Sequence, residues 1–352
     1  MEHTLYRRPL PDGTIAFSSP EGRKIFGEAL AHGGLDGYFP LAEQFHTQSD
    51  PAFCGLGSLV VALNALAIDP GRLWKGPWRW FAEDLLDCCV PLSHVRERGL
   101  SLDELGCLAG CNGAEVELQR GAAAADNLAV FRSALQQSAN ASRVLIAAYD
   151  RSALGQTGSG HFSPIGGYHR ERDLVLVLDV ARFKYPPHWI SAERLWRATH
   201  GSDPATGRAR GWLLLRPRAN GVALGFSLRC EGEGWQALGA RLRAVAAELE
   251  QARELEHVAR TLAPLAAHVE LREPSAPAHK SALASARAAL HEHPAYAAFL
   301  GVVGAERAEA TLLLSCLLAQ PLHAQLLATQ AGEALAGELA NLSAQLRAIT
   351  EL

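Results

Sequence analysis

The chain has 352 residues and a formal net charge of −4, with 33 lysines and arginines against 37 aspartates and glutamates. Hydrophobic residues make up 48% of the chain and charged residues 20%, as in ordinary globular proteins. This balance excludes a general electrostatic attraction to nucleic acid or to an acidic membrane. The N-terminal stretch MEHTLYRRPLPDGTIAF has no long apolar core, so we expect a cytoplasmic protein without a secretory signal.

The first 219 residues mix short apolar runs with Gly, Pro, Trp and Cys, which predicts an α+β domain. Residues at three- and four-residue spacing predict one helix over Cys54–Ala67, ended by the turn sequence DPG: Leu56, Leu59, Val60, Leu63 and Leu66. Four later apolar runs predict neighbouring, mostly antiparallel strands: Arg143–Asp150, His161–His169, Asp173–Val180 and Arg210–Pro217.

Residues 220–352 are rich in Ala, Leu, Glu, Arg and Gln and form a second, helical region in this interpretation. Helices are predicted over Trp235–His268 and Ser281–Leu290, with EPSAPAHK as a linker between them and His291 and His293 on the surface. Four leucines form a stripe that favours packing on the same domain: Leu335, Leu339, Leu342 and Leu346. A homodimer through this region stays an open alternative.

Seven cysteines in a chain without a signal argue against a disulfide framework, so free thiols are expected. The best candidates for a soft metal ion are Cys88, Cys89, Cys107 and Cys111. No matching second half of a zinc motif follows them, so core packing or a place at the rim of a substrate cleft is favoured and a metal site stays unknown.

Cys54 would lie at the N-terminus of the predicted helix, where unpaired N–H groups stabilise a thiolate and lower its pKa. A nucleophile also needs a base, a group that orients the base, and a donor for the oxyanion. His161 opens a strand after the glycine-rich GQTGSG and is the candidate base. Asp179 lies inside a run that should be buried and so requires a partner, which His161 supplies if the two strands are neighbours. Gln48, in the turn before the helix, is the candidate donor to the oxyanion.

Several stretches resemble the phytochelatin synthases, which are also called glutathione γ-glutamylcysteinyltransferases: AEQFHTQSDPAFCGL, LNALAIDPGRLWKGPWRWF, LLDCC, GQTGSGHFSPIGGYH and LDVARFKYPPHW. The resemblance runs from about Leu5 to Pro217. It implies a papain-like cysteine-protease fold with an added helix-rich C-terminal region, and it matches the four candidate residues in order and in motif.

The resemblance implies a dipeptidyl transfer. Cys54 would attack the Cys–Gly bond of glutathione, release glycine, and pass the γ-Glu-Cys unit from a thioester to another glutathione or to a growing phytochelatin. It also implies no organic cofactor, and stimulation by cadmium or zinc mainly because metal–glutathione thiolates are the acceptor.

The resemblance places Asp203 and Arg210 at the γ-glutamyl end of the substrate, which carries charges of both signs. It places Arg182 and Tyr185 near the second substrate. The chain departs from plant relatives at Phe53, where they usually carry a tyrosine, so a hydrogen bond from that hydroxyl to the acceptor is absent and an altered acceptor affinity is expected. Only Cys230 and Cys316 lie beyond residue 220, so a metal-sensing tail of the plant type is not expected.

Two other classes of function remain open. A hydrolase of the same fold would remove glycine from glutathione or its S-conjugates, with water as the acceptor. A non-catalytic metal-binding scaffold would not need Gln48, Cys54, His161 and Asp179 together.

Overall fold

The computed structural model describes residues 7–318 except 72, 89, 219–224, 229–234, 250, 251, 253 and 272–276. Beyond residue 318 it describes 335, 336, 338, 339, 342, 343, 345 and 346. Cys89 and Cys230 therefore lie outside the described residues.

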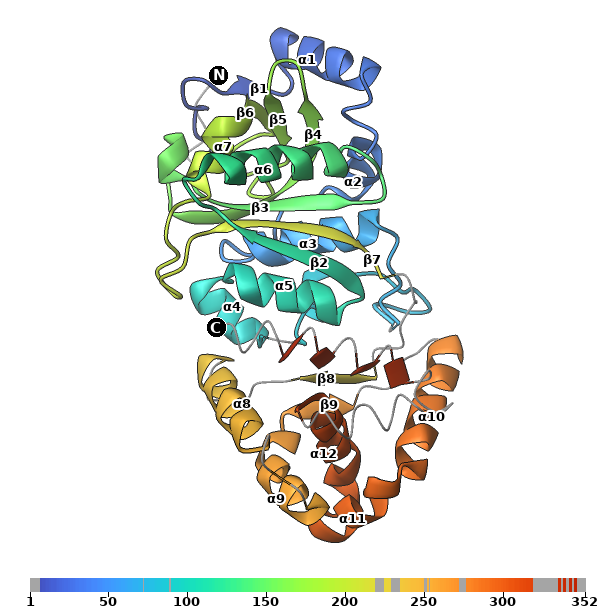
Figure 1. Cartoon of the computed structure of the whole chain (residues 1–352). Coiled ribbons are helices and arrows are strands. Elements are labelled where there is room, and N and C mark those ends of the chain that lie inside the picture. The colour runs from blue at the N-terminus through green and yellow to red at the C-terminus, as the bar shows by residue number, and fades with distance from the viewer. Residues whose placement is uncertain are drawn as a thin grey trace.

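A seven-stranded antiparallel sheet, of order β1-β6-β5-β4-β3-β7-β2, forms the centre of the first region (Figure 1). Its strands are β1 Ile15–Ala16, β2 Ala114–Arg120, β3 Val144–Asp150, β4 Gly160–His169, β5 Leu174–Val177, β6 His188–Ser191 and β7 Gly211–Pro217. The helices of this region are α1 Pro20–Ala31, α2 Tyr38–Gln44, α3 Cys54–Ala65, α4 Leu92–Arg98, α5 Leu102–Cys111, α6 Ala125–Ser138 and α7 Ala192–Ala198. Two short 3-10 turns, Glu83–Leu85 and Ser152–Leu154, lie between them. The predicted α+β class and the four antiparallel strands are confirmed.

Alternation along β3 divides the core between the two faces of the sheet. Val144 and Ile146 belong to the cluster that includes residues of α3 and α5, whereas Leu145 and Tyr149 belong to the cluster that includes residues of α6 and α7. Successive side chains of a strand point to opposite faces, and both faces are covered here. This explains why β3 reads as an unbroken apolar run with one face directed towards Cys54 on α3.

The second region contains α8 Trp235–Leu249, α9 Leu255–Ala266, α10 Pro277–Glu292, α11 Pro294–Val303 and α12 Ala305–Leu318, with a two-stranded sheet of β8 Phe226–Leu228 and β9 Val269–Leu271. It lies below the first region in Figure 1. The helical character is confirmed, and the small sheet was not predicted. The four leucines of the stripe are buried at 0–6% exposure, in a core cluster that also contains residues of the first region.

Three expectations are corrected by the structure. Cys88 and Cys111 form a disulfide, because α5 brings its last residue to within 6.7 Å (Cα–Cα) of Cys88. Cys107 is also disulfide-bonded, so the expectation of free thiols is wrong for these three residues. The predicted linker is shorter, since α10 already begins at Pro277, where a proline is tolerated in the first turn of a helix. His293 is buried rather than on the surface, because its Nδ1 accepts a hydrogen bond from the Ala295 N–H and caps α11.

None of the helices that the structure describes is both long enough and apolar enough to span a membrane.

Candidate active site

Cys54 begins α3 and is half-buried, with the sulfur at the helix end where backbone N–H groups lack intrahelical partners. The helix starts there because Asp50 Oδ1 accepts the Ala52 N–H at 3.0 Å and turns the chain just before it. Gly57 lets the neighbouring chain approach closely, since a Cβ there would lie 2.9 Å from Glu83 Oε1 and 3.3 Å from Gln48 Cβ. The first turn of α3 is thus packed against the Gln48 turn.

His161 and Asp179 meet because β4 and β5 are paired neighbours in the sheet. The His161 ring donates from Nε2 to Asp179 Oδ1 at 2.9 Å, and both side chains are buried, at 4% and 0% exposure. The predicted neighbourhood of these two residues is confirmed. Asp179 lies just beyond the end of β5, where the Ala181 N–H also donates to its Oδ1 at 2.9 Å.

His161 also interacts with Cys54 through its charge and a side-chain hydrogen bond. Burial raises the pKa of the Cys54 thiol, but the charge and hydrogen bond of His161, the Phe162 backbone N–H and the charge of Arg151 outweigh it and hold that pKa below its usual value. Burial and Arg151 lower the pKa of His161, but Asp179 and Cys54 outweigh them and raise it. A lowered thiol pKa beside a raised imidazole pKa favours a thiolate–imidazolium pair.

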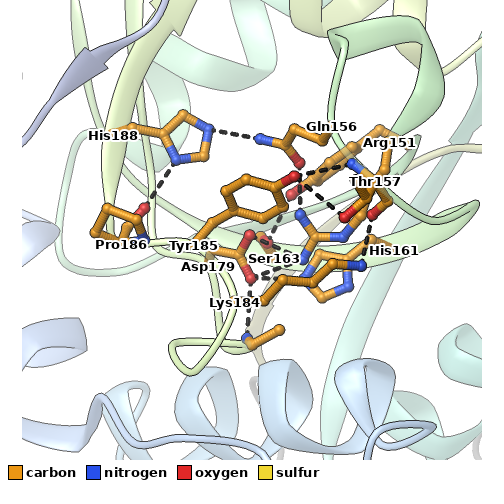
Figure 2. A network of polar contacts seen from close by, with 12 residues as sticks. Arg151, Gln156, Thr157, His161, Ser163, Asp179, Lys184, Tyr185, Pro186 and His188 are labelled. Atoms are coloured by element: carbon orange, nitrogen blue, oxygen red, sulfur yellow. Dashed lines mark hydrogen bonds and ion pairs between the residues drawn. The ribbon is translucent and has the colours of Figure 1, made fainter. Parts of the chain in front are cut away.

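Asp179 has a second partner that the sequence analysis missed. Arg151 Nη2 lies 2.8 Å from Asp179 Oδ2 and 3.0 Å from Oδ1, at 3% exposure of the arginine, and Figure 2 shows the two cations on one carboxylate. Although burial raises the pKa of Asp179, His161 and Arg151 bring it far below its usual range. The available signal was the position of Arg151 directly after the buried strand RVLIAAYD, where a cation needs a partner as much as Asp179 does.

Gln48 lies against the start of α3 and is buried at 5% exposure. Its backbone N–H donates to the Val180 carbonyl at 3.0 Å, which ties the turn to the residue after Asp179. Its side-chain Nε2 donates to the carbonyls of Asp50 at 2.8 Å and Pro51 at 3.0 Å. The amide is therefore close to the helix start, but its N–H groups face the turn. Glu83, also missed from the sequence, holds the same turn by accepting the Ser49 N–H.

Asp203 and Arg210 are brought together at the edge of this site. Arg210 Nη1 lies 3.5 Å from Asp203 Oδ2, and the two residues are buried at 7% and 8% exposure, respectively. The guanidinium lies against the backbone of Gly160, where a Cβ would be only 2.3 Å from Nη1. Charges of both signs therefore lie next to the residue that precedes His161.

Arg182 and Tyr185 are not brought together in this way. Arg182 is exposed, with its guanidinium carbon 4.9 Å from the centre of the Phe45 ring. Tyr185 is 1% exposed, and its hydroxyl accepts the Thr157 N–H at 2.8 Å. Tyr185 thus holds the loop before His161 and presents no surface to a ligand.

Among the described residues, no group of three or more His, Cys, Asp or Glu side chains is arranged to hold a metal ion.

Comparison with known proteins gives relatives for the first region of the chain. The model of the family described as phytochelatin synthase matches residues 5–212. A glutathione gamma-glutamylcysteinyltransferase 3 of Lotus japonicus is 49% identical over 236 residues, which are 66% of this chain and 49% of the relative. A glutathione gamma-glutamylcysteinyltransferase 1 of Arabidopsis thaliana is 51% identical over 234 residues, 66% and 48% of the two chains. The corresponding protein of Schizosaccharomyces pombe is 42% identical over 218 residues, 62% and 52% of the two chains. The chain spans about half the length of these curated relatives.

Proposed function

The chain belongs to the phytochelatin synthase family, and from this premise we propose that it is a dipeptidyl transferase of papain-like fold. It takes the γ-Glu-Cys unit from glutathione, releases glycine, and transfers the unit to a second glutathione or to a phytochelatin. The observation that carries the proposal is a series of contacts: Cys54, at the N-terminus of α3, interacts with His161, and His161 is hydrogen-bonded to the buried Asp179.

In the first half of the reaction, the Cys54 thiolate attacks the carbonyl carbon of the Cys–Gly amide. The imidazolium of His161 then gives its proton to the departing glycine nitrogen, the C–N bond breaks, and a thioester remains on Cys54. The Cys54 backbone N–H and the Gln48 amide stabilise the oxyanion. Gln48 must exchange one of its two carbonyl partners for the oxyanion to do so.

In the second half, the α-amine of the acceptor attacks the thioester and His161 takes its proton. The Cys54 thiolate leaves, and the product carries one more γ-Glu-Cys unit. Water in place of the amine gives hydrolysis. Phe53, buried at 5% exposure at the helix start, supplies no hydroxyl for the acceptor.

For the γ-glutamyl end, Asp203 faces the ammonium and Arg210 the carboxylate, because an arginine fork fits a carboxylate with two parallel hydrogen bonds. Arg182, exposed near the site, offers a charge to the acceptor. Tyr185 acts on the second substrate only through the loop at Thr157 that it holds.

Cadmium and zinc enter as metal–glutathione thiolates, which are substrates of the reaction. The reaction takes place in the cytoplasm.

The thioester is the direct test. Intact-mass measurement after brief exposure to glutathione should show one γ-glutamylcysteinyl adduct, mapped by peptide mass to Cys54. Cys54→Ala should show none, and Cys316→Ala, at a buried cysteine of the second region, should leave the adduct unchanged. An adduct on another residue, or a wild-type protein that consumes glutathione without one, would contradict the proposed pathway.

A further inference from the structure

The hydrogen bonds around Asp179 continue beyond the catalytic residues into a chain of buried side chains (Figure 2). Arg151 donates from Nη1 to Gln156 Oε1 at 2.5 Å, while its Nη2 faces Asp179. Gln156 is 4% exposed and His188 is 0% exposed, and their Nε2 atoms lie 3.4 Å apart. Neither Gln156 nor His188 has a place in the reaction proposed above.

The far end of this chain fixes the direction of every hydrogen bond in it. His188 Nδ1 lies 2.9 Å from the Pro186 carbonyl, which can only accept, so Nδ1 carries the hydrogen. In neutral imidazole the other nitrogen is then an acceptor, and it receives the Gln156 Nε2–H. Burial lowers the pKa of His188, in agreement with a neutral ring. With its NH₂ group turned to His188, Gln156 presents its oxygen to Arg151.

Several other groups face this arginine. The Arg151 guanidinium carbon lies 5.2 Å from the centre of the Tyr185 ring, and its charge interacts with Tyr149, Asp179 and Cys54. Lys184 also belongs to these surroundings, and its Nζ donates to the Thr157 carbonyl at 2.5 Å. The other titratable groups around Arg151 are the His161 and His188 rings. Among the described residues, Asp179 is the carboxylate paired with Arg151, and it also accepts the hydrogen bond of His161.

We infer that Gln156 and His188 are positioning residues: they hold Arg151 as a fixed positive charge against Asp179, and thereby set the pH range over which Cys54 and His161 form their reactive ion pair. Arg151 lowers the pKa of both Cys54 and His161. Without the Gln156 oxygen the guanidinium keeps its contacts with Asp179 and the Tyr185 ring but loses the hydrogen bond that fixes its other nitrogen. We expect it then to shift away from Cys54 and His161, and both pKa values to rise together. The inference deepens the proposed function, since it rests on Cys54 and His161 as the reacting pair.

The test is the pH profile of Cys54 alkylation by iodoacetamide, followed by the mass of the Cys54 peptide in the full chain without glutathione. Gln156→Met removes both hydrogen bonds at similar length, and Gln156→Asn keeps the amide but is too short to reach both partners. The profile has two inflections, one where the thiolate forms beside the imidazolium and one where His161 loses its proton and leaves a free thiolate. Both inflections should move to higher pH, by about half a unit or more, in the direction set by Arg151→Met, which removes the charge. Gln136→Met, at an exposed position on α6, is the matched control and should leave the profile unchanged.

A variant that melts at a lower temperature but keeps both inflections in place would overturn the inference, because Gln156 would then act by packing alone. Movement of the two inflections in opposite directions would overturn it as well. The profile requires no turnover, so a protein that makes no phytochelatin yet shows the predicted movement would contradict the proposed function and leave this inference standing.

Discussion

Asp179 contacts two cationic side chains, His161 and Arg151, and its negative charge stabilises both. It orients His161 through Nε2 and it neutralises the buried Arg151. Its pKa lies far below the usual value, so the stability it contributes is complete above about pH 4, the unfolded value, and is lost as the pH falls towards its folded pKa.

Asp179→Asn should therefore reduce activity by a factor of about 10² to 10⁴, since His161 loses the partner that raises its pKa. The alkaline limb of the pH–rate profile should move to lower pH. Stability should fall by about 3 to 5 kcal/mol, because Arg151 keeps a buried charge without its counterion. Steady-state rates between pH 5 and 10 and urea denaturation measure the two effects. Asp126→Asn, at an exposed position, is the control, and an unmoved alkaline limb would show that Asp179 does not act on His161.

Among the elements, the start of β4 brings the proposed substrate-binding residues next to the proposed base. Gly160 leaves room for the Arg210 guanidinium, and the next residue in the strand is His161. Arg210 can therefore reach Asp203 only because position 160 has no side chain.

A methyl group at position 160 would lie 2.3–2.4 Å from three guanidinium atoms of Arg210, Nη1, Cζ and Nη2. Gly160→Ala should therefore displace Arg210. We expect KM for glutathione to rise about tenfold, which corresponds to 1.4 kcal/mol, with a smaller change in kcat. Gly27→Ala, where a Cβ on α1 meets nothing within 4 Å, should leave both constants unchanged. Equal losses in kcat and in kcat/KM, with KM unchanged, would instead place the damage at His161.

Much of this arrangement could be predicted from the sequence, because local patterns determine it. The spacing of Leu56 and its neighbours gave the helix behind Cys54, and four apolar runs gave the strands that bring His161 to Asp179. Arg151, Gln156 and His188 could not be found in this way, because their contacts depend on pairings across 28 and 32 residues. The bond between Cys88 and Cys111 likewise depends on how α5 packs, which no spacing in the chain reveals.

On the scale of the whole molecule, a buried carboxylate ties the C-terminal residues to the start of β8 within the second region. We propose residues 1–219 as the catalytic domain and 220–352 as the helical region joined to it. Glu338 accepts the backbone N–H groups of Gly225 at 2.9 Å and Phe226 at 3.0 Å, at 2% exposure. Burial raises the pKa of Glu338 to about 7, although these N–H groups and the charge of Arg218 lower it in part.

A pKa raised in the folded state means that Glu338 contributes most to stability below its unfolded pKa of 4.5, and that this contribution is lost as the pH rises through about 7. Glu338→Gln, which carries no charge, should remove this dependence and flatten the free energy of unfolding between pH 5 and pH 8. Chemical denaturation at several pH values measures it. Glu292→Gln, at an exposed helix end, is the control, and the same slope in wild type and Glu338→Gln would refute the assignment.

The most direct test of the proposed activity is the product made from glutathione. We would incubate the wild-type protein and Cys54→Ala with glutathione, with and without a cadmium or zinc salt, and separate the products by mass. We expect glycine together with peptides that grow by γ-glutamylcysteine units in the wild type, more of them with the metal salt, and none with Cys54→Ala. Glycine and free γ-glutamylcysteine alone would mean that water is the acceptor, and an unchanged glutathione pool would contradict the assignment of Cys54 as the nucleophile.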